Sequence, residues 1–141
     1  MDFKNANELL TLCEEKNLPV SEVMRIREIE LGETSAEIVN EKMTRVLEIM
    51  KDAAFSPIKQ PVKSMGGLIG GEARKLSLHA QEKKRLCGDL LQKAITYAMA
   101  TLETNASMGL IVASPTAGSA GIVPGLMLAM QEHYQDRKSV V

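Results

Sequence analysis

Apolar residues recur three and four positions apart along most of this chain, which is the spacing of one face of an α-helix. The face is clearest over residues 34–54, where Thr34 and Glu37 form a capping box. Its apolar positions are Ile38, Met43, Val46, Leu47, Met50 and Ala54. A strand would need alternating apolar and polar residues, and the one β-branched run, residues 109–114, is short enough to be helix or strand. The pattern therefore predicts an all-α fold.

Start and stop signals divide the helical pattern into segments. The expected signals, in chain order, are an N-cap at Asn5 with Glu8 three residues later, an N-cap at Ser21, a stop at Gly32, a helix start at Glu72, an N-cap at Asp89 and Pro124 in the first turn of a last helix. Two prolines within residues 55–64 are expected to end the third helix and lead into a loop. Because aromatic residues make up only 3% of the chain and there are nine methionines, we expect an aliphatic core with methionine filling its gaps.

Length and composition limit the kinds of function open to the chain. A length of 141 residues, 45% of them hydrophobic and 25% charged, fits one globular domain. A net charge of −1 gives no reason to expect nucleic acid or an anionic membrane as a partner. The longest apolar runs fall short of the roughly 20 residues of a membrane span, and the N-terminus does not resemble a signal peptide. We therefore expect a cytoplasmic protein that binds neither nucleic acid nor membrane.

Residues 64–71, SMGGLIGG, place four glycines in a loop just before a predicted helix. The loop does not match a Walker phosphate loop, because Gly71 is followed by Glu72 rather than by lysine. Free backbone amides at a helix start, followed by the cations of Arg74 and Lys75, would suit a small carboxylate. The alternative is a close crossing of two helices that needs glycine only for packing.

Residues 114–121, SPTAGSAG, form a second loop, rich in hydroxyl groups and set between two apolar segments. Hydroxyls in an apolar setting usually contact a ligand or a structural water, and an ordinary capping loop is the alternative. The candidate substrate-binding residues of the two loops and the segments beside them are Ser64, Gly66, Gly67, Gly70, Gly71, Arg74, Lys75, Asn105, Ser114, Thr116, Gly118 and Ser119. His79 and His133 are the only histidines, and they complete no Ser–His–Asp set, so the catalytic residues stay unassigned.

The segments GGLIGGEARKL, residues 66–76, and ETNASMGLIVASPTAGSAGIVPG, residues 103–125, resemble the α subunit of the iron–sulfur-dependent L-serine dehydratases. The resemblance extends over residues 5–135. It implies an all-helical catalytic domain of a lyase, L-serine ammonia-lyase, that forms pyruvate and ammonia. It also implies a four-iron four-sulfur cluster whose unligated iron acts as a Lewis acid on the leaving β-hydroxyl. The implied partners are L-serine, a β subunit or β domain, and further copies of the enzyme in an oligomer.

The resemblance places the family's cluster cysteines downstream of the second loop, and Cys13 and Cys87 lie on no family motif. No metal ligand is therefore predicted in this chain. Residues 136–141, DRKSVV, continue no hydrophobic pattern and back-translate into what looks like a common sequencing adapter. We expect residues 1–135 to be the N-terminal part of a serine dehydratase α-type domain and residues 136–141 to be a non-native tail. Such a truncated chain should be inactive and should expose apolar surface over residues 111–128.

Two other functions stay open. An iron–sulfur L-cysteine desulfidase would share the overall plan of the site, and a non-catalytic helical module could bind a small carboxylate. The second loop favours the serine dehydratase without deciding the substrate.

Overall fold

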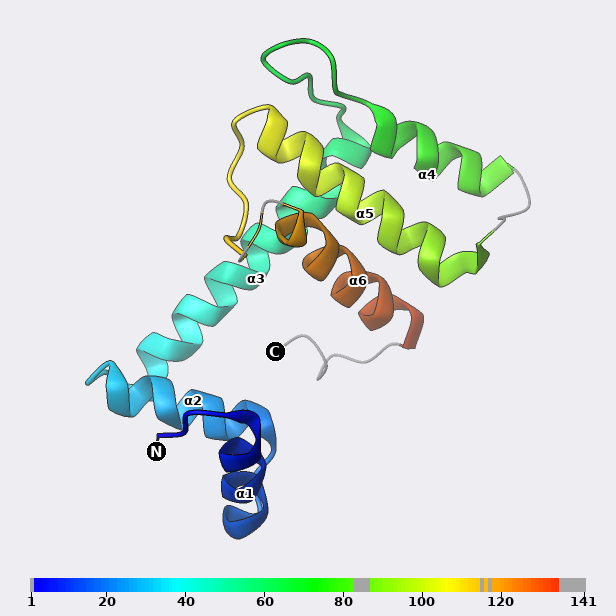
Figure 1. Cartoon of the computed structure of the whole chain (residues 1–141). Coiled ribbons are helices and arrows are strands. Elements are labelled where there is room, and N and C mark those ends of the chain that lie inside the picture. The colour runs from blue at the N-terminus through cyan, green and yellow to red at the C-terminus, as the bar shows by residue number, and fades with distance from the viewer. Residues whose placement is uncertain (1, 83–86, 115, 117, 135–141) are drawn as a thin grey trace. The chain divides into compact units, whose positions relative to one another are not determined.

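The computed structural model describes residues 2–82, 87–114, 116 and 118–134. They form the helices α1 (Ala6–Lys16), α2 (Val20–Leu31), α3 (Ala36–Lys59), α4 (Glu72–Glu82), α5 (Gly88–Ala106) and α6 (Ser119–Tyr134), shown in Figure 1. None of the described residues lies in a strand, so the predicted all-α fold is confirmed. The chain divides into two compact units, residues 1–45 and 46–141, with the division inside α3. The predicted non-native tail lies outside the described residues.

In the first unit, α1 begins as predicted. The Asn5 side chain accepts a hydrogen bond from the Glu8 N–H at 3.0 Å, and the Glu8 carboxylate accepts bonds from the side-chain amide of Asn5 and the backbone N–H of Lys4. The cap thus satisfies the Glu8 N–H, which has no partner within the helix. The predicted stop of α2 is also confirmed, since Gly32 is its C-cap.

The predicted N-cap of α2 at Ser21 is wrong. The helix starts at Val20 with Pro19 as its N-cap, and the Pro19 carbonyl accepts hydrogen bonds from the N–H groups of Glu22 and Val23. The fixed φ of proline prepares this start without a side-chain cap, so Ser21 lies inside the first turn.

The capping box predicted at Thr34 is wrong by one residue. α3 starts at Ala36, and the Ser35 hydroxyl accepts a hydrogen bond from the Ile38 N–H at 3.4 Å. Thr34 and Ser35 are both chemically able to cap a helix, so only the backbone path selects between them.

Two prolines and one aspartate lie inside helices that they were expected to limit. Pro57 lies within α3, which ends at Lys59, and Pro124 lies within α6 rather than in its first turn. Both prolines are buried. Asp89, the predicted N-cap of α5, follows Gly88 inside the first turn, where its charge still favours the positive end of the helix.

The second unit is built around α5, which packs against both α4 and α6 (Figure 1). Gly121 and Gly125 of α6 face the α5 backbone. A Cβ added at Gly125 would lie 2.8 Å from the Ala98 nitrogen and 2.9 Å from the Ala94 carbonyl oxygen. One added at Gly121 would lie 3.1 Å from the Ala98 carbonyl oxygen. At Gly125 the backbone of α6 therefore meets that of α5 directly, while at Gly121 the Leu102 side chain also lies beside the contact.

The core of the second unit is aliphatic, as predicted, but alanine takes the place expected for methionine. Its buried apolar side chains are Ala53, Ala54, Ala73, Ala94, Ala100, Ala120, Leu128 and Ala129. Met65 and Met108 are 82% and 78% exposed. The small alanine side chain lets helices approach closely, so the core needs no flexible side chain to fill gaps.

The segment 111–128, where the sequence predicts exposed apolar surface, is exposed only in part. Ile122, Val123 and Leu126 are exposed, whereas Ala120 and Leu128 are buried. Leu110, just before the segment, is also exposed. Among the described helices, none combines the length and the apolar character needed to cross a membrane.

Candidate functional site

The glycine loop, residues 64–71, lies against the C-terminal end of α5 and leads into α4 (Figure 1). Ser64 closes the loop: its N–H donates to the Ile69 carbonyl at 2.8 Å, and its hydroxyl accepts from the Ile69 N–H at 3.1 Å. The Met65 N–H donates to the Ala106 carbonyl of α5 at 3.3 Å. The loop is therefore a closed structure attached to a helix distant in sequence.

Three of the loop's glycines have backbone conformations that other residues rarely adopt. Gly67, Gly70 and Gly71 have φ values of 69°, 150° and 92°. A Cβ at Gly70 would also lie 2.1 Å from the Val62 carbonyl oxygen, whereas one at Gly66 would meet nothing within 4 Å. The glycines thus serve the fold of the loop itself, and not a helix crossing.

Two glutamate side chains accept hydrogen bonds from backbone N–H groups at, or just before, the start of α4. Glu103 of α5 accepts a hydrogen bond through Oε1 from the Ala73 N–H at 2.8 Å. Glu72 accepts one through Oε2 from the Gly70 N–H at 2.6 Å. Hydrogen bonds from its own backbone N–H and from that of Gly70 lower the pKa of Glu72. In this structure two of the amides near the predicted carboxylate site, those of Gly70 and Ala73, are therefore bound to internal carboxylates.

Glu103 is the residue that sequence reasoning missed. Its side chain is 1% exposed, and among the described residues its Oε2 has no hydrogen-bond partner. A charged residue is rarely buried without such a partner. The available signal was its position four residues after Met99, on a helix face otherwise predicted to be apolar.

The two cations after the loop have different surroundings. The Arg74 guanidinium donates to the carbonyl of Lys59, the last residue of α3. Lys75 lies beside a hollow of about 390 Å³, the α4 hollow, which is lined by Glu72, Lys75, Leu76 and Met99. Arg74 therefore caps a helix, while Lys75 lies where a ligand could reach it.

The second loop starts where α5 ends. Met108 adopts a left-handed conformation, and the N–H groups of Met108 and Gly109 donate to the carbonyls of Asn105 and Thr104. This is the Schellman pattern of a helix end, with methionine where glycine is usual. The predicted site residue Asn105 is exposed in the last turn of the helix, and Ser114 is half-buried further along the loop.

The hydroxyls of Thr116 and Ser119 bind each other's backbone. The Ser119 N–H donates to Thr116 Oγ1 at 3.1 Å, and the Thr116 N–H donates to Ser119 Oγ at 3.0 Å. This reciprocal pair is a capping box at the start of α6. Gly118, between them, has open space where a Cβ would be. The alternative of a capping loop therefore accounts for these two hydroxyls.

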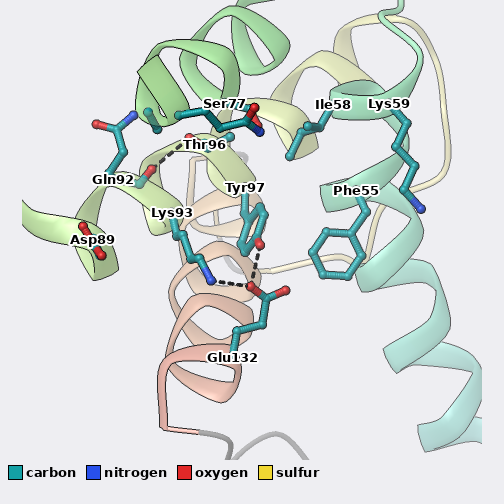
Figure 2. A pocket seen from close by; sticks show the side chains of 12 residues that line it. Phe55, Ile58, Lys59, Ser77, Asp89, Gln92, Lys93, Thr96, Tyr97 and Glu132 are labelled. Carbon is teal, nitrogen blue, oxygen red and sulfur yellow. Dashed lines mark hydrogen bonds and ion pairs between the residues drawn. The ribbon is translucent and has the colours of Figure 1, made fainter. Parts of the chain in front are cut away.

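A second hollow, the Tyr97 cavity, lies among α3, α4, α5 and α6 and has a volume of about 410 Å³ (Figure 2). The Tyr97 hydroxyl donates to Glu132 Oε2 at 2.8 Å, and Lys93 Nζ lies 2.9 Å from the same oxygen. Burial, and then the hydrogen bond to Glu132, raise the pKa of Tyr97. The rings of Phe55 and Tyr97 pack edge to face, with their centroids 5.1 Å apart. Tyr97, Lys93 and Glu132 therefore bind one another in this cavity.

Metal ligands do not gather in the part of the chain that the structure describes. No group of three or more His, Cys, Asp or Glu side chains there could hold a metal ion. Cys13 lies half-buried in α1, and Cys87 is exposed just before α5. His79 and His133 are both exposed.

Residues 15–141 match the family described as serine dehydratase alpha chain. The chain is 42% identical over 130 residues to a probable L-serine dehydratase alpha chain of Bacillus subtilis, covering 92% of this chain and 43% of that protein. It is 35% identical over 139 residues to the L-serine dehydratase alpha chain of Peptoniphilus asaccharolyticus, covering 98% of this chain and 48% of that protein. No solved structure matches.

The chain thus spans less than half the length of these two relatives. The matched region includes the glycine loop, Glu103 and the second loop, all of which lie within residues 15–141.

Proposed function

Since the chain belongs to the serine dehydratase alpha chain family, we propose that it is part of an L-serine ammonia-lyase, which converts L-serine to pyruvate and ammonia. The observation that carries the proposal is the 42% identity to a probable L-serine dehydratase alpha chain over 92% of this chain. The matched stretch is 130 residues long, so the proposal does not rest on one short motif.

In this reaction the chain's own residues would bind and orient the substrate. L-serine carries an ammonium group, a carboxylate and a hydroxyl, and elimination requires the Cα proton and the β-hydroxyl to be held in a defined geometry. Lys75 is the proposed partner of the carboxylate, because it borders the α4 hollow while Arg74 is bound to the Lys59 carbonyl. Ser64, Asn105 and the loop glycines remain candidate substrate contacts.

The described residues do not fit a four-iron four-sulfur cluster. Such a cluster is held mainly by cysteine thiolates, and Cys13 and Cys87 lie in different units of the chain. We propose that its ligands belong to the part of a serine dehydratase α chain that this chain does not cover. No catalytic step is therefore assigned here to iron.

The remaining proposals concern the setting of the enzyme. The complete protein would act in the cytoplasm, with a β subunit or β domain and as an oligomer. The exposed apolar side chains Leu110, Ile122, Val123 and Leu126 support contact with a further part of such an assembly.

The experiment is to express the complete coding region, purify the product without oxygen and measure pyruvate formed from L-serine. We expect pyruvate from L-serine and none from D-serine, and an iron–sulfur absorbance that the 141-residue chain alone does not develop. The short chain should form no pyruvate after treatment with iron and sulfide. A complete product that leaves L-serine unchanged would overturn the proposal.

A further inference from the structure

The helix α6 has apolar residues on every side, including the side that the structure leaves exposed. Residues 120–130 contain no polar side chain. The buried positions of α6 are Ala120, Gly121, Pro124, Gly125, Leu128 and Ala129. Large apolar side chains on its other side are between 39% and 62% exposed, and they are Ile122, Val123, Leu126 and Met130. A helix that is apolar all round belongs in the interior of a protein, because a surface helix carries polar residues on its outer side.

A second apolar stripe runs along α5. Its members are spaced four and seven residues apart, which places them on one side of the helix, and they are Leu91, Ile95 and Leu102. Each of them is exposed. Thr104 lies two positions after Leu102 and so about 200° further round the helix. Its hydroxyl donates to the Ala53 carbonyl of α3 at 3.0 Å. The stripe therefore faces away from α3.

The stripes on α5 and α6 adjoin where the two helices pack against each other (Figure 1). A Cβ added at Gly121 would lie 3.4 Å from Leu102 Cγ, so Leu102 borders α6. The next residue of α6 is the exposed Ile122. We name this surface the α5–α6 face, and it consists of Leu91, Ile95, Leu102, Ile122, Val123, Leu126 and Met130. An exposed apolar patch that spans two helices indicates a contact with another part of a protein.

Composition indicates which kind of contact this is. An interface between subunits that also exist apart is about as polar as ordinary protein surface and has a polar rim. By contrast, no charged residue occurs in the sequence between Glu103 and Glu132, which is typical of the interior of a domain. The match with two serine dehydratase α chains covers only 43% and 48% of their lengths. Such an α chain therefore has more than half of its residues available to cover the face.

We propose that the α5–α6 face is covered by apolar helices from the part of a serine dehydratase α chain that this chain does not include. The inference rests on the proposed function and deepens it, since it names the partner of this surface. In the complete α chain, α6 would then be an internal helix and not a surface helix. A β subunit and a second copy of the chain are the alternatives that the test separates.

The test compares how fast a thiol introduced by Leu126→Cys reacts in the 141-residue chain and in the complete α chain without a β subunit. Mass spectrometry follows labelling of the peptide that contains position 126, so other cysteines do not interfere. We expect labelling at least about tenfold slower in the complete α chain, since a buried group reacts only when its surroundings open. The rate should not depend on protein concentration.

Three results would overturn the proposal. Equal rates in the two chains would show that the face stays exposed, and a coding region that adds no residues beyond 141 would leave nothing to cover it. Protection that needs an added β subunit, or that grows with protein concentration, would assign the face to another subunit. Leu10→Cys is the control, because Leu10 is an exposed leucine of α1 outside the face. Equal slowing at both positions would mean general protection and would also count against the proposal.

A second measurement uses Leu126→Lys, whose effect should differ between the two chains. In the complete α chain it would bury a charge without a partner, and the thermal unfolding midpoint should fall by about 5 °C or more. In the 141-residue chain the ammonium group can reach water, so the midpoint should change little and self-association should decrease. An unchanged midpoint in the complete α chain would contradict the proposed cover.

Neither measurement requires turnover of L-serine, so the inference and the proposed function fail separately. Protection of position 126 in a complete α chain that forms no pyruvate with any β subunit would refute only the function. Pyruvate formation without protection of position 126 would refute only the cover of the α5–α6 face.

Discussion

The glycine loop and the second loop, called the hydroxyl loop here for its Ser114, Thr116 and Ser119, are both rich in small residues, yet they are held in place in different ways. The glycine loop is attached to α5 through Met65 and Ala106 and leads into a helix start bound by Glu103. The hydroxyl loop is closed by bonds between Thr116 and Ser119, three residues apart. The first loop therefore depends on distant parts of the chain, and the second mainly on itself. Composition alone does not reveal this difference.

The largest effect is expected at Gly70. Gly70→Ala would place a Cβ 2.1 Å from the Val62 carbonyl oxygen at a φ of 150°. Steric overlap together with the unfavourable φ should reduce the free energy of unfolding by about 3 kcal/mol. Urea unfolding of the chain measures this loss. Gly66→Ala is the matched control, because its Cβ would meet nothing within 4 Å. Equal losses in the two variants would contradict a loop fixed by tertiary contacts.

Substitution of Lys75 tests whether the region after the glycine loop also binds a ligand. In the complete enzyme, Lys75→Ala should raise KM for L-serine by about tenfold and change kcat much less, since a carboxylate contact contributes mainly to ground-state binding. Steady-state kinetics separate the two constants. Arg74→Ala should instead lower thermal stability, because Arg74 donates to the Lys59 carbonyl. Unchanged kinetics for Lys75→Ala would make Lys75 a solvent-exposed residue without a role in binding.

The hydroxyl loop should respond to a purely local change. Thr116→Ala removes the hydroxyl that accepts from the Ser119 N–H, and losing such a cap costs about 1 kcal/mol. Thr116→Ser keeps the hydroxyl and should keep most of the stability, as measured by thermal unfolding. A loss well beyond that of an ordinary cap in Thr116→Ala would mean that this loop, too, depends on distant contacts.

The smallest effect concerns the pH dependence at Glu72. Its pKa in the folded chain lies below the ordinary value of 4.5, so ionised Glu72 contributes stability above pH 4.5, and this is lost as pH falls through the folded pKa. Glu72→Gln should therefore be less stable than the original chain at neutral pH, and the difference should shrink below pH 4.5. Denaturant unfolding at several pH values measures it. A difference that stays constant down to pH 3 would exclude a contribution from this carboxylate.

Helical periodicity was sufficient to predict the all-α fold, because an apolar face at three-and-four spacing is a local property of the sequence. Caps were less predictable. Asn5 was predicted correctly, whereas Ser21 and Thr34 were wrong because Pro19 and Ser35 could start the same helices. The capping pair Thr116 and Ser119 was open to prediction, since both partners lie within one turn.

Glu103 could not be predicted in the same way. Its burial and its bond to Ala73 link residues 30 positions apart, and no local pattern encodes such a contact. The contact between the glycine loop and the end of α5 could not be predicted for the same reason. It depends on the hydrogen bond from the Met65 N–H to the Ala106 carbonyl, two residues far apart in the sequence. The sequence thus suggested candidate residues, but not the contacts between distant parts of the chain that arrange them.

The bare contact between α5 and α6 has a mechanical consequence. Where side chains separate two helices, rotamer changes can absorb a small shift of one helix before the other moves. At Gly125 no side chain separates the two helices, because a Cβ there would meet only the α5 backbone, whereas at Gly121 the Leu102 side chain also lies close. We therefore expect a displacement at the Thr116–Ser119 end of α6 to be passed on to α5, the helix that carries Glu103. The two loops would then be mechanically linked, even though their own hydrogen bonds are separate.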